Sequence, residues 1–142
     1  MILIAILLKG LLPMMPSVFR VLIVEDDLDQ ANLFKLILAT AGYQVAAVPD
    51  VETAMAHLSE NPVDLLFVDW NLPGTRGDIF ITAVKLLYPT IITLLASNHL
   101  YLKEAALACG ADACFRKMEG NAALRQLLTE LLSKRVAVEV TA

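Results

Sequence analysis

The chain has 142 residues, of which 58% are apolar, and its formal net charge is −4. This length fits one domain, which can bury a core without disulfides or a structural metal. The acidic balance argues against general affinity for nucleic acid. Cys109 and Cys114 are the only cysteines, and we expect two reduced, buried thiols in a cytoplasmic protein.

The first 17 residues are predicted to lie outside this domain. Met1 to Leu8 is unbroken apolar sequence, followed by Lys9-Gly10. An apolar run of this length is too short for a transmembrane span, which takes roughly 20 residues. It also lacks the basic start and the cleavage site of a secretory signal. Three interpretations stay open: translation begins at Met15, the segment anchors weakly to a membrane surface, or it makes an apolar contact.

Beyond residue 17, short apolar runs alternate with segments of helical periodicity. Apolar runs bounded by turn residues predict buried strands, and apolar residues three and four positions apart predict amphipathic helices. In chain order we expect strand 20–25, helix 28–41, strand 43–48, a helix from Asp50 to the stop at Asn61-Pro62, strand 64–69, helix 78–87, strand 91–96, helix 99–109, strand 113–116 and helix 120–134.

Residues at the predicted helix ends support these boundaries. Asp50 is a suitable N-cap, because its side chain can accept a hydrogen bond from a free backbone N–H. Gly42 and Gly110 stand where glycine commonly ends a helix. The apolar segment 136–142 is expected to be a short tail, so the predicted domain spans 18–135. No room then remains for a DNA-binding module after the last helix.

Five successive strand–helix units predict an α/β fold with a doubly wound, five-stranded parallel sheet. In such sheets the carboxyl ends of the strands carry the chemistry. Asp69 ends the third apolar run and precedes a Pro-Gly turn. The topology would bring it to the same edge as Glu25, Asp26 and Lys117. A pocket that collects this much negative charge suits a metal cation.

Three segments, taken in order, resemble the response-regulator receiver domain of two-component signalling. They are Val21–Asp27, Leu66–Gly74, and Gly110-Ala111-Asp112 with Lys117 seven residues after the glycine. The resemblance covers residues 18–134. It implies a (βα)5 flavodoxin-like fold and a cytoplasmic, single-domain response regulator.

The resemblance also implies a role for each matching residue. Asp69 would be the phosphoacceptor, taking a phosphoryl group from a phosphohistidine of a sensor histidine kinase or a histidine phosphotransfer protein. Mg²⁺ would be bound by Glu25, Asp26, Asp69 and the backbone carbonyl of Asn71. Lys117 would contact a phosphoryl oxygen. The protein would not be a dedicated enzyme, although its own site would promote acceptance and hydrolysis of the phosphoryl group.

Signalling would then pass through a downstream protein target, without direct contact with nucleic acid. A homodimer is also possible within the family. Asp27 would simply begin the first helix, where the helix dipole favours an acidic residue.

Two departures from the family concern the switch that follows phosphorylation. The fourth strand of the family usually ends in Thr or Ser. Counting back from Gly110 places Leu95 there, and a shift of two would give Ser97 that role instead. The aromatic switch position of the fifth strand holds Cys114, beside Phe115. A third departure is Met118, which stands where the family often has proline after the lysine.

Other interpretations remain for the chain and its residues. A receiver-fold interaction domain that is not phosphorylated would fit the altered switch positions. An aspartate-nucleophile phosphohydrolase of the haloacid dehalogenase type fits poorly, because it carries Asp-x-Asp after its first strand. Asp69 could also cap a turn, and Lys117 could be a surface lysine. Trp70 could shield the site or merely pack, and we expect His57 and His99 to be solvated.

Overall fold

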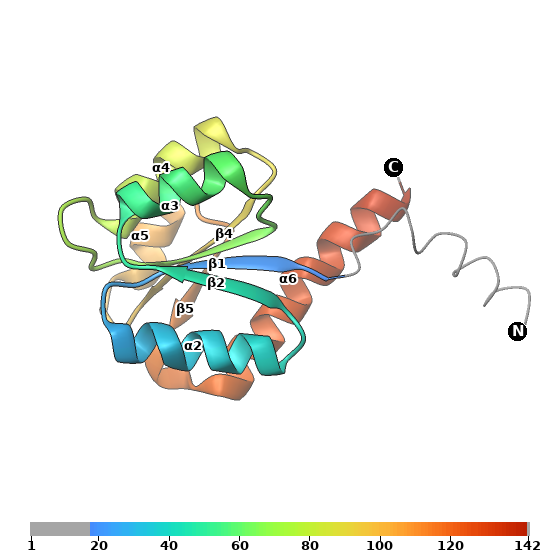
Figure 1. Cartoon of the computed structure of the whole chain (residues 1–142), viewed down its shortest axis with the longest axis horizontal. Helices are drawn as coiled ribbons and strands as arrows, with labels where there is room; N and C mark the ends of the chain where they lie inside the picture. The colour runs from blue at the N-terminus through green and yellow to red at the C-terminus, as the bar shows by residue number, and fades with distance from the viewer. Residues whose placement is uncertain (1–17, 142) are drawn as a thin grey trace, which may run out of the picture.

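The computed structural model describes residues 18–141, and it contains one five-stranded parallel sheet with helices on both faces (Figure 1). The strand order is β2-β1-β3-β4-β5. The predicted doubly wound fold is therefore confirmed. The elements are β1 (Arg20–Val24), α2 (Leu28–Thr40), β2 (Gln44–Val48), α3 (Val51–Glu60), β3 (Leu65–Asp69), α4 (Gly77–Leu87), β4 (Ile92–Ser97), α5 (Leu102–Cys109), β5 (Ala113–Arg116), the 3-10 turn η2 (Lys117–Glu119) and α6 (Asn121–Thr141).

The sheet separates two hydrophobic cores. Leu22 and Leu66 face the core under α3, α4 and α5, whereas their neighbours Ile23 and Phe67 face the core under α2 and α6. All four side chains are fully buried. Burial of one such side chain stabilises the fold by about 1.5–3 kcal/mol. The central strands are apolar on both faces because each face is covered by helices.

The strand register aligns the ends of the strands at one edge. Val24 of β1 lies opposite Val68 of β3, and Asp69 lies opposite Ala96 of β4. Ser97, the last residue of β4, lies opposite Arg116. Residues that follow the last pair in each strand therefore share the carboxyl edge of the sheet.

The predicted helix caps are confirmed. The Asp27 carboxylate accepts a hydrogen bond from Gln30 N at 2.9 Å, and the Asp50 carboxylate accepts one from Thr53 N at 2.8 Å. Gly110 ends α5 with a φ of 78°, a left-handed conformation that side chains disfavour.

Three predictions need correction. The last helix does not end near residue 134 but continues to Thr141, because no glycine or proline interrupts the sequence after Asn121. Helix α5 begins at Leu102 rather than at residue 99, because a turn follows β4. Cys109 and Cys114 are free thiols, but both are only partly buried. No helix among the described residues is long and apolar enough to cross a membrane.

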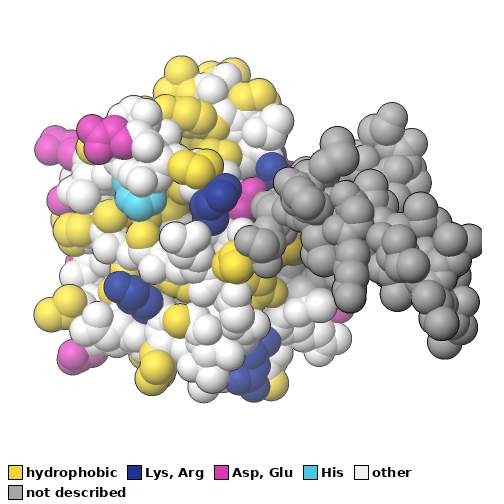
Figure 2. All heavy atoms as spheres, turned by 45° about the vertical axis from the view of Figure 1, so that its right-hand side comes forward, with side chains coloured by type: hydrophobic (Ala, Val, Ile, Leu, Met, Phe, Trp, Pro, Cys, Tyr) yellow, Lys and Arg dark blue, Asp and Glu magenta, His cyan; other side chains and the backbone are white. Residues whose placement is uncertain are grey.

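Helix α4 packs Phe80, Ile81 and Val84 into the core, and it also presents other apolar side chains to solvent. Lys85 Nζ lies 2.9 Å from the Asp112 carboxylate, and Thr82 Oγ1 lies 3.4 Å from the carbonyl oxygen of Cys109. Leu86 is 82% exposed and Leu87 is 60% exposed. Figure 2 shows hydrophobic side chains gathered over this helix, at the top of that view.

Gly77, the first residue of α4, lies against the backbone of Asp69. A Cβ atom at Gly77 would be 2.1 Å from the carbonyl oxygen of Asp69 and 2.9 Å from a methyl group of Val68. The N–H of Gly77 donates to the carbonyl of Trp70 at 2.9 Å. The absence of a side chain here lets α4 start directly behind the end of β3.

We expect the substitution Gly77→Ala to lower the free energy of unfolding by at least about 1–3 kcal/mol, the usual cost of overpacking. The main-chain oxygen of Asp69 cannot rotate away, so the start of α4 must shift. Urea denaturation measures the stability. The fluorescence of the native protein reports the shift through Trp70, the one tryptophan of the chain.

Gly42→Ala is the matched control, because Gly42 has a φ of 102° with nothing within 4 Å of a new Cβ atom. It should cost about 1–2 kcal/mol through backbone conformation alone and leave the native Trp70 emission unchanged. Wild-type stability and emission in Gly77→Ala would refute the close contact.

Candidate functional site

Three acidic residues meet at the carboxyl edge of the sheet. Glu25 and Asp26 directly follow β1, and Asp69 is the last residue of β3. One carboxylate oxygen from each lies within 4.8 Å of the others. Glu25 and Asp69 are buried, whereas Asp26 is exposed. In the part of the chain that the structure describes, this is the one group of acidic, histidine or cysteine side chains with metal-binding geometry.

Lys117 bridges the two buried acids. Its Nζ atom lies 3.2 Å from Asp69 Oδ1 and 3.3 Å from Glu25 Oε2. It also donates to Gln30 Oε1 at 2.8 Å. The lysine side chain is only 13% exposed. The predicted set of Glu25, Asp26, Asp69 and Lys117 is therefore brought together, and Gln30 is a contact that the sequence pattern gave no reason to expect.

Glu25 holds its proton unusually strongly. Burial, followed by the hydrogen bond and the negative charge of Asp69, raises its pKa to about 8, against the opposing effect of Lys117. The low accessibility and the neighbouring carboxylate both disfavour the charged form. At neutral pH without a cation, the pair Glu25 and Asp69 thus retains a proton that a bound dication would displace.

The turn after β3 fixes the carboxylate of Asp69. Asn71 N donates to Asp69 Oδ1 at 3.3 Å, and Trp70 N donates to the carbonyl of Ala96 at 2.9 Å. A side-chain oxygen bonded to an N–H two residues later is a common device in turns. One oxygen of Asp69 is thereby held toward Asn71 and Lys117.

The prediction that Leu95 ends the fourth strand is wrong, because β4 continues to Ser97. Leu95 is fully buried in the core under α3, α4 and α5, opposite Val68. Ser97 stands one residue beyond Ala96, the register partner of Asp69. The loop between β4 and α5 is therefore two residues shorter than the family spacing, counted back from Gly110, had predicted.

Cys114 and Phe115 face opposite sides of the sheet. Cys114 lies opposite Leu95 and packs against the core under α3, α4 and α5. Phe115 is buried in the other core, with its ring centroid 6.3 Å from that of Phe67. Phe115 therefore does not replace an aromatic side chain at the Cys114 position.

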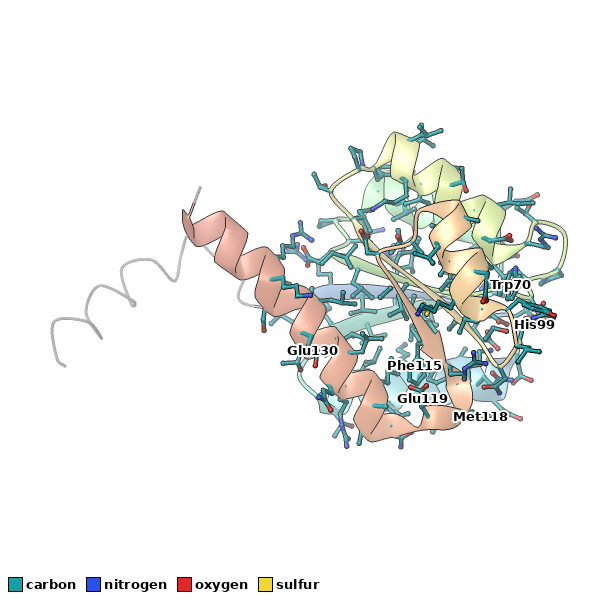
Figure 3. The ribbon with its side chains drawn as sticks, turned by 180° about the vertical axis from the view of Figure 1, so that it is seen from behind. Trp70, His99, Phe115, Met118, Glu119 and Glu130 are labelled. Carbon is teal, nitrogen blue, oxygen red and sulfur yellow. The ribbon has the colours of Figure 1, made fainter. Side chains whose placement is uncertain are left out.

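Side chains from three loops meet at the rim of the site. The rings of Trp70 and His99 contact edge to face, with centroids 4.9 Å apart, and Figure 3 places both at the carboxyl edge. Met118 N donates to Asn98 Oδ1 at 2.8 Å. His99 is exposed, as expected, but its contact with Trp70 was not predicted. The two residues are far apart in sequence, and no local pattern relates them.

The donor set fits Mg²⁺. Mg²⁺ prefers oxygen ligands, keeps several waters and is commonly held by one or two carboxylates. The three carboxylates come from two rigid strand ends, and the exposed Asp26 leaves one side open to water. A hollow of about 210 Å³ opens beside Glu25 and Asp26, between α2 and the end of β2.

We expect the stability of the metal-free protein to fall as the pH rises from about 4.5 to about 8. The pKa of Glu25 is higher in the folded than in the unfolded chain. The folded state therefore binds more protons throughout this window, and deprotonation favours unfolding. Urea denaturation in EDTA measures this slope, which Mg²⁺ should reverse.

Glu25→Gln is the control, because its neutral side chain does not titrate. Relative to this variant, wild type should lose stability between pH 5.5 and 8. Parallel stability curves for the two proteins would contradict the assignment of the proton to Glu25.

Comparison with known proteins relates this chain to one protein family. The family model described as the response regulator receiver domain matches residues 21–129. PhoB, the phosphate regulon transcriptional regulatory protein of Escherichia coli strain K12, is 35% identical over 66 residues, which cover 46% of this chain and 29% of PhoB. The virulence sensor protein BvgS of Bordetella pertussis is 28% identical over 132 residues, which cover 86% of this chain and 11% of BvgS. The chain spans less than a third of the length of these two relatives.

Solved structures agree with the fold. A CheY-like receiver domain protein from Methanospirillum hungatei JF-1 has a TM-score of 0.79 at 25% identity, covering 85% of this chain and 98% of that one. A protein from Chloroflexus aurantiacus J-10-fl that is described as a response regulator has a TM-score of 0.78 at 27% identity. The match covers 82% of this chain and 99% of that one.

Proposed function

This chain belongs to the response regulator receiver family, and on that basis we propose that it accepts a phosphoryl group on Asp69. The donor is a phosphohistidine of a sensor histidine kinase or a histidine phosphotransfer protein, and Mg²⁺ is required. The observation that carries the proposal is the arrangement of Asp69 with two other carboxylates within 4.8 Å and with Lys117 Nζ at 3.2 Å.

Phosphoryl transfer between two anionic groups depends on positioning and on charge neutralisation. A carboxylate oxygen of Asp69 attacks phosphorus as the phosphorus–nitrogen bond to the donor histidine breaks, and the product is an aspartyl phosphate. Asn71 N and Lys117 both contact Asp69 Oδ1, and Oδ2 is the oxygen proposed to attack. Bound Mg²⁺ supplies positive charge to the phosphoryl oxygens.

Glu25, Asp26, Asp69 and the backbone carbonyl of Asn71 are the proposed protein ligands of the cation. The buried Glu25 would bind the cation as a carboxylate and release its proton to water, because a carboxylate must be charged to act as a ligand. Lys117 then transfers its contact from Asp69 to a phosphoryl oxygen. Its hydrogen bond to Gln30 keeps the ammonium group at the edge of the site during this change.

Ser97 is proposed to donate its hydroxyl proton to the phosphoryl group. The Ser97 oxygen accepts a hydrogen bond from His99 N at 3.0 Å, so a lone pair is used and the proton remains free. The side chain is only 2% exposed and stands at the strand end beside the Asp69 position. In this proposal Ser97, rather than Leu95, occupies the switch position at the end of the fourth strand.

Output is proposed to pass to a downstream protein target through direct contact, in the cytoplasm and without nucleic acid. Homodimerisation is one form that such contact could take. The name of PhoB describes a transcriptional regulatory protein, of which this chain covers 29%. The net charge of −4 supports a protein target rather than a nucleic acid for this domain.

The alternative of a receiver-fold domain that is not phosphorylated has less support. Keeping two buried carboxylates beside each other disfavours their charged forms, as the pKa of Glu25 reflects. A structural role alone gives no reason for this arrangement. The phosphohydrolase alternative requires a second acid two residues after Asp69, and Asn71 occupies that position.

Incubation with acetyl phosphate and Mg²⁺ should add the mass of one phosphoryl group to wild type and none to Asp69→Asn. Acetyl phosphate tests the acceptor without the cognate kinase. Intact-mass spectrometry measures the product, and EDTA should prevent its formation. Asp78→Asn is the control, because Asp78 belongs to α4 and pairs with Arg76 rather than with Lys117.

Phosphate uptake by Asp69→Asn under these conditions would falsify the acceptor assignment. Failure of wild type to take up phosphate at millimolar Mg²⁺ would favour the domain that is not phosphorylated.

We expect Ser97→Ala to slow phosphorylation by about 10²-fold, the effect of removing one donor to a developing anionic group. A quench-flow or hand-mixed time course with acetyl phosphate measures the rate. Ser97→Thr keeps the hydroxyl and should stay near the wild-type rate. If Ser97→Ala reacts as fast as Ser97→Thr, the hydroxyl does not contact the phosphoryl group.

A further inference from the structure

The loop between β4 and α5 is organised by His99. The His99 backbone N–H donates to Ser97 Oγ at 3.0 Å, and its carbonyl accepts from Leu102 N at 3.2 Å. Its imidazole Nδ1 accepts from Tyr101 N at 3.1 Å. Tyr101, the N-cap residue of α5, makes no side-chain cap bond. His99 therefore satisfies two of the free N–H groups that precede or begin this helix.

The bond to Tyr101 depends on the protonation state of His99. A nitrogen that accepts a hydrogen bond must carry a lone pair, so Nδ1 is unprotonated in this arrangement. An imidazolium ion has two N–H donors and no acceptor. Protonation would set an N–H of the ring against the N–H of Tyr101, and the ring would have to turn away.

The imidazole ring also contacts the residue next to the acceptor. Its centroid lies 4.9 Å from the Trp70 ring, with an interplanar angle of 71°. Trp70 directly follows Asp69, and Figure 3 shows the two labelled rings beside each other. A rotation of the imidazole away from Tyr101 N would therefore also change the packing of Trp70.

The charged groups around His99 come from the adjacent loops. From β5, the Arg116 guanidinium donates to the His99 carbonyl at 3.0 Å. From β3, the Asp69 carboxylate precedes Trp70, and it is paired with Lys117, which follows β5. From α5, the Tyr101 ring lies 5.8 Å from the imidazole centroid. The ring itself is exposed, so a proton from water can reach it.

We propose that His99 is a proton-operated positioning residue for the acceptor site. Neutral His99 caps α5 through its imidazole and packs Trp70 beside Asp69. The imidazolium form releases the cap and the Trp70 contact. Since imidazole changes charge between about pH 5 and 8, the packing around Asp69 should respond to pH within that range. The effect on phosphorylated Asp69 rests on the proposed function, whereas the effect on Trp70 does not.

Trp70 fluorescence tests the first part, because Trp70 is the only tryptophan and His57 and His99 are the only histidines. Emission should be titrated between pH 5 and 8.5 in wild type, His99→Asn and His57→Asn. Asparagine can accept the bond from the N–H two residues later and does not titrate. His57 lies on α3 and lines a hollow with Arg20, Gln44 and Asn61, away from the acceptor.

Wild type and His57→Asn should share a transition that His99→Asn lacks. The proton of Glu25 is common to all three proteins, so the difference between the curves isolates His99. A transition that persists unchanged in His99→Asn would overturn the proposal.

The lifetime of the aspartyl phosphate tests the second part. Proteins phosphorylated with acetyl phosphate are desalted into Mg²⁺ buffers at pH 5.5 and 7.5, and the decay of the added mass is followed. The lifetime of the wild-type aspartyl phosphate, divided by that of His99→Asn, should be smaller at pH 5.5 than at pH 7.5, because release of Trp70 admits water. His99→Leu, which has no acceptor, should behave at both pH values like wild type at low pH.

If the ratio of the wild-type lifetime to the His99→Asn lifetime does not change with pH, His99 has no positioning role. Absence of phosphorylation in every protein would count against the proposed function instead, and the fluorescence titration would still decide whether His99 controls Trp70.

Discussion

The buried ion pairs of Lys117 are the interaction on which the rest of the site depends. Two carboxylates, Glu25 and Asp69, are withdrawn from water at the same strand edge. An uncompensated buried charge costs several kcal/mol. One ammonium group, 92 residues from Glu25 in the sequence, contacts both acids. Even so, Glu25 retains a raised pKa. The site therefore has a deficit of positive charge, which a dication would supply.

Much of this arrangement could be predicted from the sequence. Apolar runs ending in Glu25 and Asp69 indicate buried strands with acids at the carboxyl ends, and parallel topology brings such ends to one edge. The helix caps at Asp27 and Asp50 could also be predicted, because capping depends on neighbours three residues away. Fold and acidic cluster thus follow from local patterns combined with one topological rule.

Other features could not be predicted because they depend on loop length and tertiary contact. Counting from Gly110 placed Leu95 at the strand end, and the shorter loop gives that position to Ser97. No pattern in the chain relates Gln30 to Lys117 or His99 to Trp70, since each contact joins segments that are far apart in the sequence. The extension of α6 to Thr141 was not predicted, because the stripe of leucines stops at Leu132, although no glycine or proline ends the helix there.

The departure from the family pattern at Met118 allows a hydrogen bond at the rim of the site. Proline at position 118 would have no N–H, whereas Met118 donates its N–H to Asn98 Oδ1. Arg116 adds a second bond to the same loop, at the carbonyl of His99. The segments after β4 and β5 are thus tied together by hydrogen bonds.

The contact between Gly77 and Asp69 also determines how the domain can move. The first turn of α4 lies directly against the carbonyl of Asp69, with no side chain between them to absorb a displacement, so we expect the two backbones to shift together. A small change in the Asp69 main chain is therefore transmitted along the axis of α4 to its opposite end. The exposed Leu86 and Leu87 at that end would move with it, which makes them remote reporters of events at the acceptor.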